Sequence, residues 1–334
     1  MNKDSNLFAE HLYKFLGDYL PSEKNASSNT ISSYRDSFKL FIRYMSEEKN
    51  LQPTRISMVH ISKDNLKAFL DWLENSRNCS IRSRNQRLAA FKSFLNYIQY
   101  KDPTLIFENQ KIQSMPQKKY TKKEVSYMSL ENLKILLEQP VLSTANGLRD
   151  AAILTLMYAA ALRVQELIEL QWEDLRLDYT PYTVRVHGKG DKYRSVPLTD
   201  FAKELLMEYR SKSLKTTWVF YNAQRNPLTR KGVAYILNKY VSKSKINPEF
   251  CHDDTITCHV LRHTKAAHML QAGVPLIYIR DFLGHSSVKT TEIYAKLNDA
   301  AKFQAINDLS YEVATPEKSD WNADEELMSW LESL

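Results

Sequence analysis

Glycine is scarce in this chain, with seven glycines in 334 residues, about a third of the usual share of ~7%. The glycine-rich strings GxGxxG and GxxxxGK[ST], which hold dinucleotides and nucleotide phosphates, do not occur among them. The sequence therefore argues against a dinucleotide-binding fold and against a P-loop.

Cysteine and long apolar runs are scarce as well. There are three cysteines, an odd number that forms no even disulfide framework and is typical of a reducing compartment. The pairs Cys251-His252 and Cys258-His259 lack zinc-site spacing, so we expect no metal. The longest apolar stretch, 151–162, is far shorter than the ~20 residues that span a bilayer, and the first residues form no apolar signal region. These features predict a cytoplasmic protein with no membrane partner.

Basic residues outnumber acidic ones, 46 to 39, which gives a formal net charge of +7. The acidic segment 312–334 conceals most of this excess, because residues 1–311 carry 45 basic and 32 acidic side chains, a charge of +13. A body this basic is compatible with a polyanionic partner, although charge alone does not identify one.

The N-terminal region predicts a small helical bundle. Apolar residues recur at helical spacing in 7–19, 30–45, 62–74 and 80–99. The outward side of the fourth segment carries the mix of basic and amide side chains that contacts phosphates and base edges in a DNA groove. A solvated basic helix face is an equally good interpretation. The candidate DNA-binding residues here are Arg82, Arg84, Asn85, Gln86, Arg87 and Lys92.

Helical periodicity fails between residues 100 and 128, where four lysines surround one aromatic residue. This composition predicts an extended basic linker that can follow a phosphate backbone. Its candidate DNA-binding residues are Lys118, Lys119, Lys122 and Lys123. We expect an N-terminal helical domain (1–110), a linker (111–126), a second domain (127–311) and an acidic tail (312–334).

The second domain predicts helices with one β-rich interruption. A buried helical region is expected at 149–169, followed by a β-hairpin whose strands, 183–186 and 193–197, flank a turn at 188–191. The fold class is therefore mainly α with a small antiparallel sheet. Further helices are expected at 200–210, 230–244, 259–272, 275–282 and 287–306.

Three charged residues in this domain stand out first. Arg163 and Glu166 are three residues apart on an otherwise apolar helix, so the two can meet one turn apart. A buried ion pair that holds the helix is the simpler interpretation. Lys189 lies between two glycines at the hairpin tip, where an ammonium group could reach a ligand, although any exposed turn can carry a lysine.

Two further strings carry histidines. His259 and Arg262 are three apart on one helical face, with His263 expected to turn off it, and cations that share a face suggest an anion between them. His285 follows Leu-Gly, and Tyr294 comes nine residues later at the start of a helix. Taken alone, a tyrosine on a helix is core or surface filler.

The order of these strings resembles the tyrosine recombinase (phage integrase, XerC/XerD-like) family. The match covers about residues 28–300, because the N-terminal strings TISSYRDSFKLFIRY and NQRLAAFKSFLNYI also resemble that family's core-binding domain. Ala161 stands where the family usually has glycine. The resemblance implies a two-domain, C-shaped DNA clamp, with a helical core-binding domain and a mixed α/β catalytic domain.

The resemblance also implies the catalytic set and its chemistry. Glu166 and His263 would support the catalytic residues without taking part in the reaction. Arginines would clamp the phosphate oxygens, Lys189 would protonate the leaving 5′-oxygen, and His259 would help Tyr294 lose its proton. A 3′-phosphotyrosine keeps the energy of the bond, so no cofactor, ATP or Mg²⁺ is implied. The implied catalytic residues are Arg163, Lys189, His259, Arg262, His285 and the nucleophile Tyr294.

The implied partners are double-stranded DNA core sites and a homo- or hetero-tetramer that exchanges strands through a Holliday junction. Such an enzyme serves mobile-element integration and transposition, or chromosome and plasmid resolution, in the bacterial cytoplasm. The tail has apolar residues at helical spacing, and we expect it to dock on a neighbouring protomer rather than on its own domain. These residues are Leu327, Trp330, Leu331 and Leu334.

Two other functions stay open from the sequence. One is a DNA-binding accessory factor that has the fold without turnover, and the complete catalytic set argues against it. The other is a type IB topoisomerase-like enzyme that relaxes supercoils alone. The N-terminal helical domain and the expected docking tail favour recombination over it.

Overall fold

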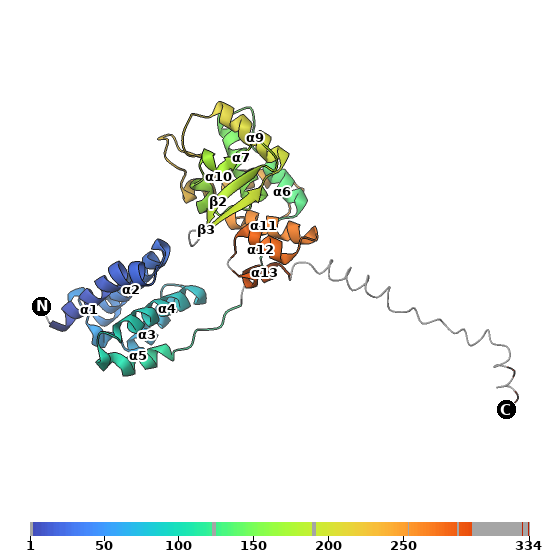
Figure 1. Ribbon diagram of the computed structural model, residues 1–334. Coiled ribbons are helices and arrows are strands. Elements are labelled where there is room, and N and C mark those ends of the chain that lie inside the picture. Colours follow the sequence, from blue (N-terminus) through green and yellow to red (C-terminus); the bar gives the residue numbers. More distant parts are fainter. Residues whose placement is uncertain are drawn as a thin grey trace. The chain divides into compact units, whose positions relative to one another are not determined.

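The computed structural model describes residues 3–121, 125–188, 192–252, 254–285 and 287–295, together with Ser329 and Ser333 (Figure 1). The chain divides into two compact units, residues 1–123 and 124–334, and each is described here by itself. Within the described ranges, no helix is long and apolar enough to cross a membrane. The chain is mainly α-helical with one small sheet, as the sequence predicts.

The first unit is a bundle of helices, and each predicted helix is present. Serines Ser27, Ser62 and Ser80 begin α2, α3 and α4 by accepting a hydrogen bond from a backbone N–H in the first turn. The helix expected at 7–19 instead begins earlier and continues as a π-helix. The elements are α1 Lys3–Lys14, η1 Phe15–Glu23, α2 Ser28–Lys49, α3 Lys63–Asn75, α4 Ile81–Ile98 and α5 Ile106–Gln113, with short 3₁₀ turns at Pro53–Arg55, Met58–His60 and Pro103–Leu105.

Aromatic rings fill the centre of this unit. Phe38 packs edge-on against Phe94 with ring centroids 5.0 Å apart, and Phe41 packs against Phe91 at 5.1 Å. Each of these four rings is at most 1% exposed. Aromatic pairs in these geometries add to the free energy gained by burial, so α2 and α4 are fixed to each other by their predicted apolar faces.

Helix α5 lies where the sequence predicts no regular structure, and that expectation is wrong for 106–113. The helix buries Ile112, and Met115 just beyond it is also buried. Lys92 of α4 donates hydrogen bonds to the carbonyls of Gln113 and Met115, both at 2.7 Å. A helix with one buried apolar residue has no periodic pattern to detect, because tertiary contacts hold it in place.

The second unit surrounds its most buried helix, α7, with other helices and a sheet. The sheet has the order β1-β2-β3, and both pairings are antiparallel. The predicted hairpin is confirmed, and β1 is an additional short strand. The helices are α6 Leu130–Leu137, α7 Ala145–Ala159, α8 Val164–Ile168, α9 Asp200–Lys212, α10 Arg230–Ser244, α11 Cys258–Gln271, α12 Leu276–Leu283 and α13 Glu292–Ala295, and the strands are β1 Leu175–Arg176, β2 Thr183–Gly188 and β3 Lys192–Pro197, with 3₁₀ turns at Trp172–Asp174 and Val288–Thr290.

The helical region expected at 149–169 is broken in two. Helix α7 ends at Ala159, and α8 begins after Arg163. Between them Ala161 has φ +47°, a left-handed conformation that side chains other than glycine rarely adopt. The glycine that the resembling family usually carries here is thus explained by the backbone, and Ala161 adopts the same conformation without it.

Candidate active site

The break before α8 places Arg163 at the start of a helix. Its backbone N–H donates to Glu166 Oε2 at 2.8 Å, and its Nη1 donates to Glu166 Oε1 at 2.6 Å. The predicted contact between Arg163 and Glu166 is therefore present. It arises from the capping of a new helix, not from two positions on one continuous helix.

Glu166 is shared by three arginines from three parts of the fold. Arg194 of β3 binds both carboxylate oxygens, Nη1 to Oε1 at 2.9 Å and Nη2 to Oε2 at 2.8 Å. Arg262 of α11 lies 4.0 Å from the same carboxylate. The Glu166 side chain is 5% exposed, and its burial alone would raise its pKa. The hydrogen bonds and charges of Arg194 and Arg163 outweigh burial and lower that pKa to about 2.

The same three arginines bind three successive backbone carbonyls at the end of α12. Arg194 Nε donates to the Phe282 carbonyl at 3.0 Å, Arg262 Nη2 donates to the Leu283 carbonyl, and Arg163 Nη2 donates to the Gly284 carbonyl at 3.3 Å. A helix C-terminus leaves its last carbonyls unpaired and carries partial negative charge. Arginines therefore stabilise this end of α12, and they fix the position of the residue that follows, His285.

Gly284 is required here for two reasons. Its φ is +62°, and a Cβ on it would lie 3.0 Å from Arg194 Cδ. The glycine thus ends α12 in the left-handed conformation and leaves room for the arginine. His285 follows it directly and places Nδ1 3.0 Å from the Oγ1 of the buried Thr291.

The positive charge of this cluster exceeds its negative charge. Three guanidinium groups gather around the single carboxylate of Glu166, and the Arg262 side chain is 2% exposed. Burial, followed by the charge of Arg163, lowers the pKa of Arg262 to about 9. A bound anion would offset this cost, because an opposite charge favours the ionised form. Two forked guanidiniums suit the oxygens of a phosphate.

The histidines of α11 are arranged differently from the prediction. His259 and His263 pack edge to face with ring centroids 5.5 Å apart. The expectation that His263 turns off the face of His259 is wrong, because residues four apart are neighbours on an α-helix. His263 Nδ1 lies 2.6 Å from the hydroxyl oxygen of Tyr294.

Burial shifts the histidines of the site toward the neutral form. It lowers the pKa of His259, with help from the charges of Arg262 and Arg163. It lowers the pKa of both His263 and His285 to about 4, and neighbouring cationic groups contribute to both shifts. At neutral pH these imidazoles therefore act as neutral hydrogen-bonding groups.

Tyr294 lies in helix α13 and is 1% exposed. Burial raises the pKa of its hydroxyl to about 12, although the charges of Arg262 and Arg163 partly oppose this shift. Helices α11, α12 and α13 lie together in the second unit (Figure 1). The ring belongs to a small apolar cluster whose other buried members are Ala161, Ala266, Ile279 and Leu283.

The structure thus brings together Arg163, His259, Arg262, His285 and Tyr294 with Glu166 and His263. Lys189 lies outside the described residues, as do Lys122, Lys123 and the apolar residues of the expected tail helix. Strand β2 ends at Gly188 and β3 begins at Lys192. The placement of Lys189 at the hairpin tip stays a prediction.

Arg194 and Thr291 are site residues that the sequence reasoning missed. A signal for Arg194 was available, because side chains two apart on a strand share a face. Arg194 and the fully buried Val196 are such a pair on β3. An arginine on the buried face of a short strand needs a partner, and Glu166 is that partner.

The candidate DNA-binding residues of α4 divide into two groups. Arg84 and Asn85 were expected to face outward, and this is wrong. Arg84 is 5% exposed with Nε 2.9 Å from Glu74 Oε1, and the Asn85 amide pairs with the backbone of Lys118 at 2.8 and 3.1 Å. Arg84 therefore joins α4 to α3, and Asn85 fastens the segment that contains Lys118 to the bundle.

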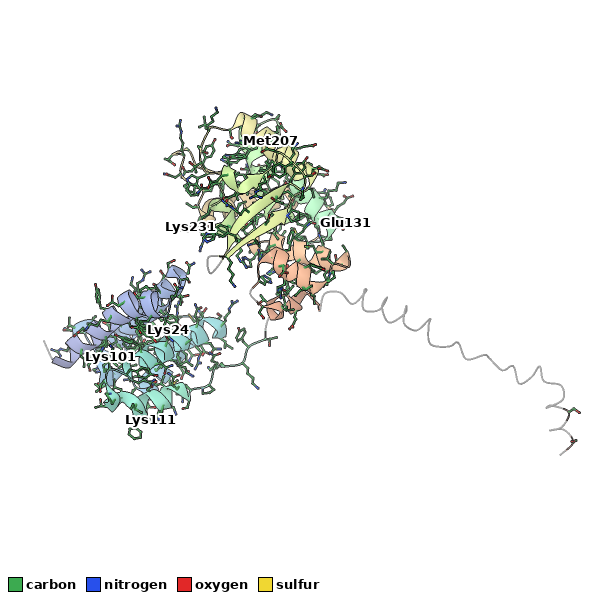
Figure 2. All side chains as sticks on the ribbon, viewed as in Figure 1. Lys24, Lys101, Lys111, Glu131, Met207 and Lys231 are labelled. Atoms are coloured by element: carbon green, nitrogen blue, oxygen red, sulfur yellow. The ribbon has the colours of Figure 1, made fainter. Side chains whose placement is uncertain are left out.

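Lys92 was also expected to face outward, but it is half-buried and its ammonium binds the carbonyls of Gln113 and Met115. The remaining candidates are closer to the surface. Gln86 and Arg87 donate hydrogen bonds to Ser33 of α2. Arg82 and Lys119 are exposed. The Lys118 ammonium pairs with Glu74 at 2.9 Å. Figure 2 shows further lysines around this unit, among them Lys24, Lys101 and Lys111, which are exposed. Contact of these residues with DNA stays a prediction.

Comparison with known proteins identifies the family. Residues 126–301 match the sequence model described as Phage integrase family, and residues 14–100 match that of the Phage integrase, N-terminal SAM-like domain. The protein y4rC of Sinorhizobium fredii, named as an integrase/recombinase, is 33% identical over 336 residues that cover 100% of both chains.

Two further relatives agree. Tyrosine recombinase XerD of Staphylococcus haemolyticus is 33% identical over 303 residues, which cover 86% of this chain and 95% of that protein. The crystal structure of the XerH site-specific recombinase bound to a palindromic difH substrate has a TM-score of 0.66 at 23% identity, over 91% of this chain and 89% of that chain. Sequence models, relatives and fold all agree with the arginine, histidine and tyrosine cluster of the second unit, and the chain therefore belongs to the phage integrase family of tyrosine recombinases.

Proposed function

We propose that this chain is a site-specific DNA recombinase that cuts and rejoins DNA through a 3′-phosphotyrosine on Tyr294. The observation that carries the proposal is the set of three arginines around the single carboxylate of Glu166, within the same cluster as Tyr294. Such a cluster is built to hold an anion and is more basic than a structural ion pair requires.

The proposed reaction follows from these groups. The scissile phosphate lies between Arg163 and Arg262, which stabilise the charge that grows on its non-bridging oxygens. The Tyr294 oxygen forms a bond to phosphorus, and the bond to the 5′-oxygen breaks. Lys189 gives that oxygen its proton. A 5′-hydroxyl of a second duplex then attacks the phosphotyrosine and returns its proton to Lys189. The bond from phosphorus to the Tyr294 oxygen breaks, the tyrosine regains its proton, and the phosphodiester is restored.

Tyr294 must lose its proton as it attacks. With a pKa of about 12, the hydroxyl is almost entirely protonated at neutral pH, so the charge of the arginines and a proton acceptor are both needed. We assign the acceptor role to His259, whose pKa is lowered by burial and which therefore begins the reaction neutral. His285 donates a hydrogen bond to the phosphate. The cationic side chains supply the charge stabilisation that a metal ion gives in other phosphoryl-transfer enzymes.

The proposed partners are DNA core sites in a cytoplasmic complex. Residues 1–110 bind core DNA, the linker 111–126 follows its backbone, the catalytic domain 127–311 cuts it, and the tail 312–334 docks on a neighbouring protomer of a tetramer. The exposed Arg82 and Lys119 are the α4 and linker residues most available to DNA. XerH, the structural neighbour, is a site-specific recombinase that was crystallised on its difH substrate, which supports this assignment.

A covalent-adduct assay tests the proposal. Wild type, Tyr294→Phe and Tyr158→Phe are incubated in EDTA with a nicked duplex that carries the candidate core site, and adducts are separated under denaturing conditions. Tyr158 is the matched control, since it is a half-buried tyrosine whose hydroxyl, like that of Tyr294, is bonded to a histidine, His268. We expect adducts from wild type and Tyr158→Phe and none from Tyr294→Phe. Intact DNA binding without any wild-type adduct would favour the accessory-factor function instead.

A further inference from the structure

A short hydrogen bond joins the nucleophile to His263. The Tyr294 hydroxyl oxygen lies 2.6 Å from His263 Nδ1, and the two ring centroids are 5.6 Å apart. His263 was expected to support the catalytic residues without taking part in the reaction. It is instead a residue that directly contacts the reacting oxygen.

Both partners of this bond are neutral at physiological pH. Burial, with the charges of His259 and Arg262, lowers the pKa of His263 to about 4, and burial raises the pKa of Tyr294 to about 12. The hydroxyl therefore donates and the unprotonated Nδ1 accepts, which leaves the imidazole proton on Nε2. Proton transfer within the pair would create two buried charges from two neutral groups, which is unfavourable.

The position of Tyr294 also keeps it away from DNA. A side chain that is 1% exposed and packed against Ala161, Ala266 and Leu283 leaves no room for a phosphate at its hydroxyl. Helix α13, which carries it, packs against α11, so the bond between Tyr294 and His263 of α11 adds to the contacts that hold the nucleophile in this position.

We propose that His263 is a positioning residue for the nucleophile: its Nδ1 holds the Tyr294 hydroxyl in this buried position, and strand cleavage requires this bond to break. The inference rests on the proposed role of Tyr294. In this role His263 has the opposite effect from a general base. A general base would accelerate cleavage, whereas the bond from His263 to Tyr294 slows it.

The test measures the single-turnover rate of adduct formation with saturating suicide DNA. His263→Ala removes the acceptor and leaves the buried hydroxyl without a partner, which weakens the buried position. His263→Asn keeps an acceptor oxygen near the place of Nδ1. The matched control is His268→Ala, which removes a His–Tyr hydrogen bond on the same helix, between His268 Nδ1 and Tyr158 at 3.1 Å.

We expect His263→Ala to form the adduct about tenfold faster than wild type, which corresponds to about 1.4 kcal/mol. His263→Asn should fall between the two, and His268→Ala should match wild type. A His263→Ala variant that binds DNA normally but reacts at the wild-type rate or more slowly would overturn the inference. If His263→Ala does not fold, His263→Leu fills the space without an acceptor and carries the same expectation.

A second readout follows the exposure of Tyr294 directly. Nitration by tetranitromethane, followed by peptide mass spectrometry, reports how accessible this phenol is in the DNA-free protein. We expect at least threefold more nitration of Tyr294 in His263→Ala than in wild type, with no change in His268→Ala. Equal nitration would contradict the inference. Failure of the proposed function is a different result, namely no adduct from wild type on any core DNA.

Discussion

Arg194 and Glu166 join the β-hairpin of the second unit to helix α8 through two parallel hydrogen bonds. The distances are 2.9 Å from Nη1 to Oε1 and 2.8 Å from Nη2 to Oε2, and both side chains are nearly buried. Arg194 Nε also binds the carbonyl of Phe282. One side chain therefore connects the hairpin expected to carry Lys189, the carboxylate that holds Arg163, and the turn before His285.

Replacement of Arg194 by methionine should strongly destabilise the second unit. The change keeps the length of the side chain but leaves Glu166 and the end of α12 without a partner, and breaking a buried pair costs about 3–5 kcal/mol. Urea unfolding followed by circular dichroism measures this loss. The matched control is Arg185→Met, on the neighbouring strand β2. It breaks a half-exposed ion pair with Asp174, so it should cost at most about 1 kcal/mol. Equal losses for the two variants would contradict a central role for Arg194.

Glu166 should give the protein an acid-sensitive component of stability. Its pKa is lowered from 4.5 to about 2 in the folded state, so its ionised form stabilises the fold above pH 4.5. This stabilisation is lost as the pH falls from about 4.5 to about 2, and it amounts to about 3 kcal/mol. Unfolding free energies between pH 6 and pH 2 measure it. In Glu166→Gln this part of the pH dependence should be absent, whereas the exposed Glu249→Gln should keep the wild-type profile.

Gly284 should tolerate alanine less well than Gly273 does. Both glycines have positive φ, +62° and +79°, so alanine at either costs about 1–2 kcal/mol of backbone strain. A Cβ at position 284 would in addition lie 3.0 Å from Arg194 Cδ, whereas a Cβ at position 273 meets nothing within 4 Å. Gly284→Ala should therefore lose more stability and should also slow adduct formation by displacing Arg194 and His285. The idea fails if the two variants behave alike in thermal unfolding and in cleavage.

Arg163→Lys should slow cleavage without preventing DNA binding. Lysine keeps the positive charge but loses the forked geometry, and removal of a preorganised donor to a developing negative charge costs about 10²–10³ in rate. Single-turnover adduct formation at saturating DNA measures the effect. Arg149→Lys provides the control, because Arg149 pairs with Asp150 on α7 and is no part of the arginine cluster. A rate within threefold of wild type would remove Arg163 from the proposed mechanism.

The helices and the hairpin could be predicted from the sequence because their signals are local. Apolar residues at helical spacing define α2, α3 and α4, and serines such as Ser62 and Ser80 mark where two of them begin. The order of the arginine, histidine and tyrosine strings was also sufficient to indicate the family. Helix α5 escaped prediction, since a segment with one buried apolar residue, Ile112, has no periodic pattern.

Tertiary structure decided which side chains meet. Spacing along a helix or strand fixes the neighbours of a residue on its own element, but the element it packs against depends on the whole fold. For this reason Arg84 and Asn85 are buried although they belong to a basic string, and Arg194 contacts Glu166 from 28 positions away. The contact of His263 with Tyr294 spans 31 positions. The sequence by itself determined the elements, the basic charge and the chemical groups of the site. Packing in three dimensions determined which groups bind the Glu166 carboxylate and the end of α12, and which residue accepts the hydrogen bond of the Tyr294 hydroxyl.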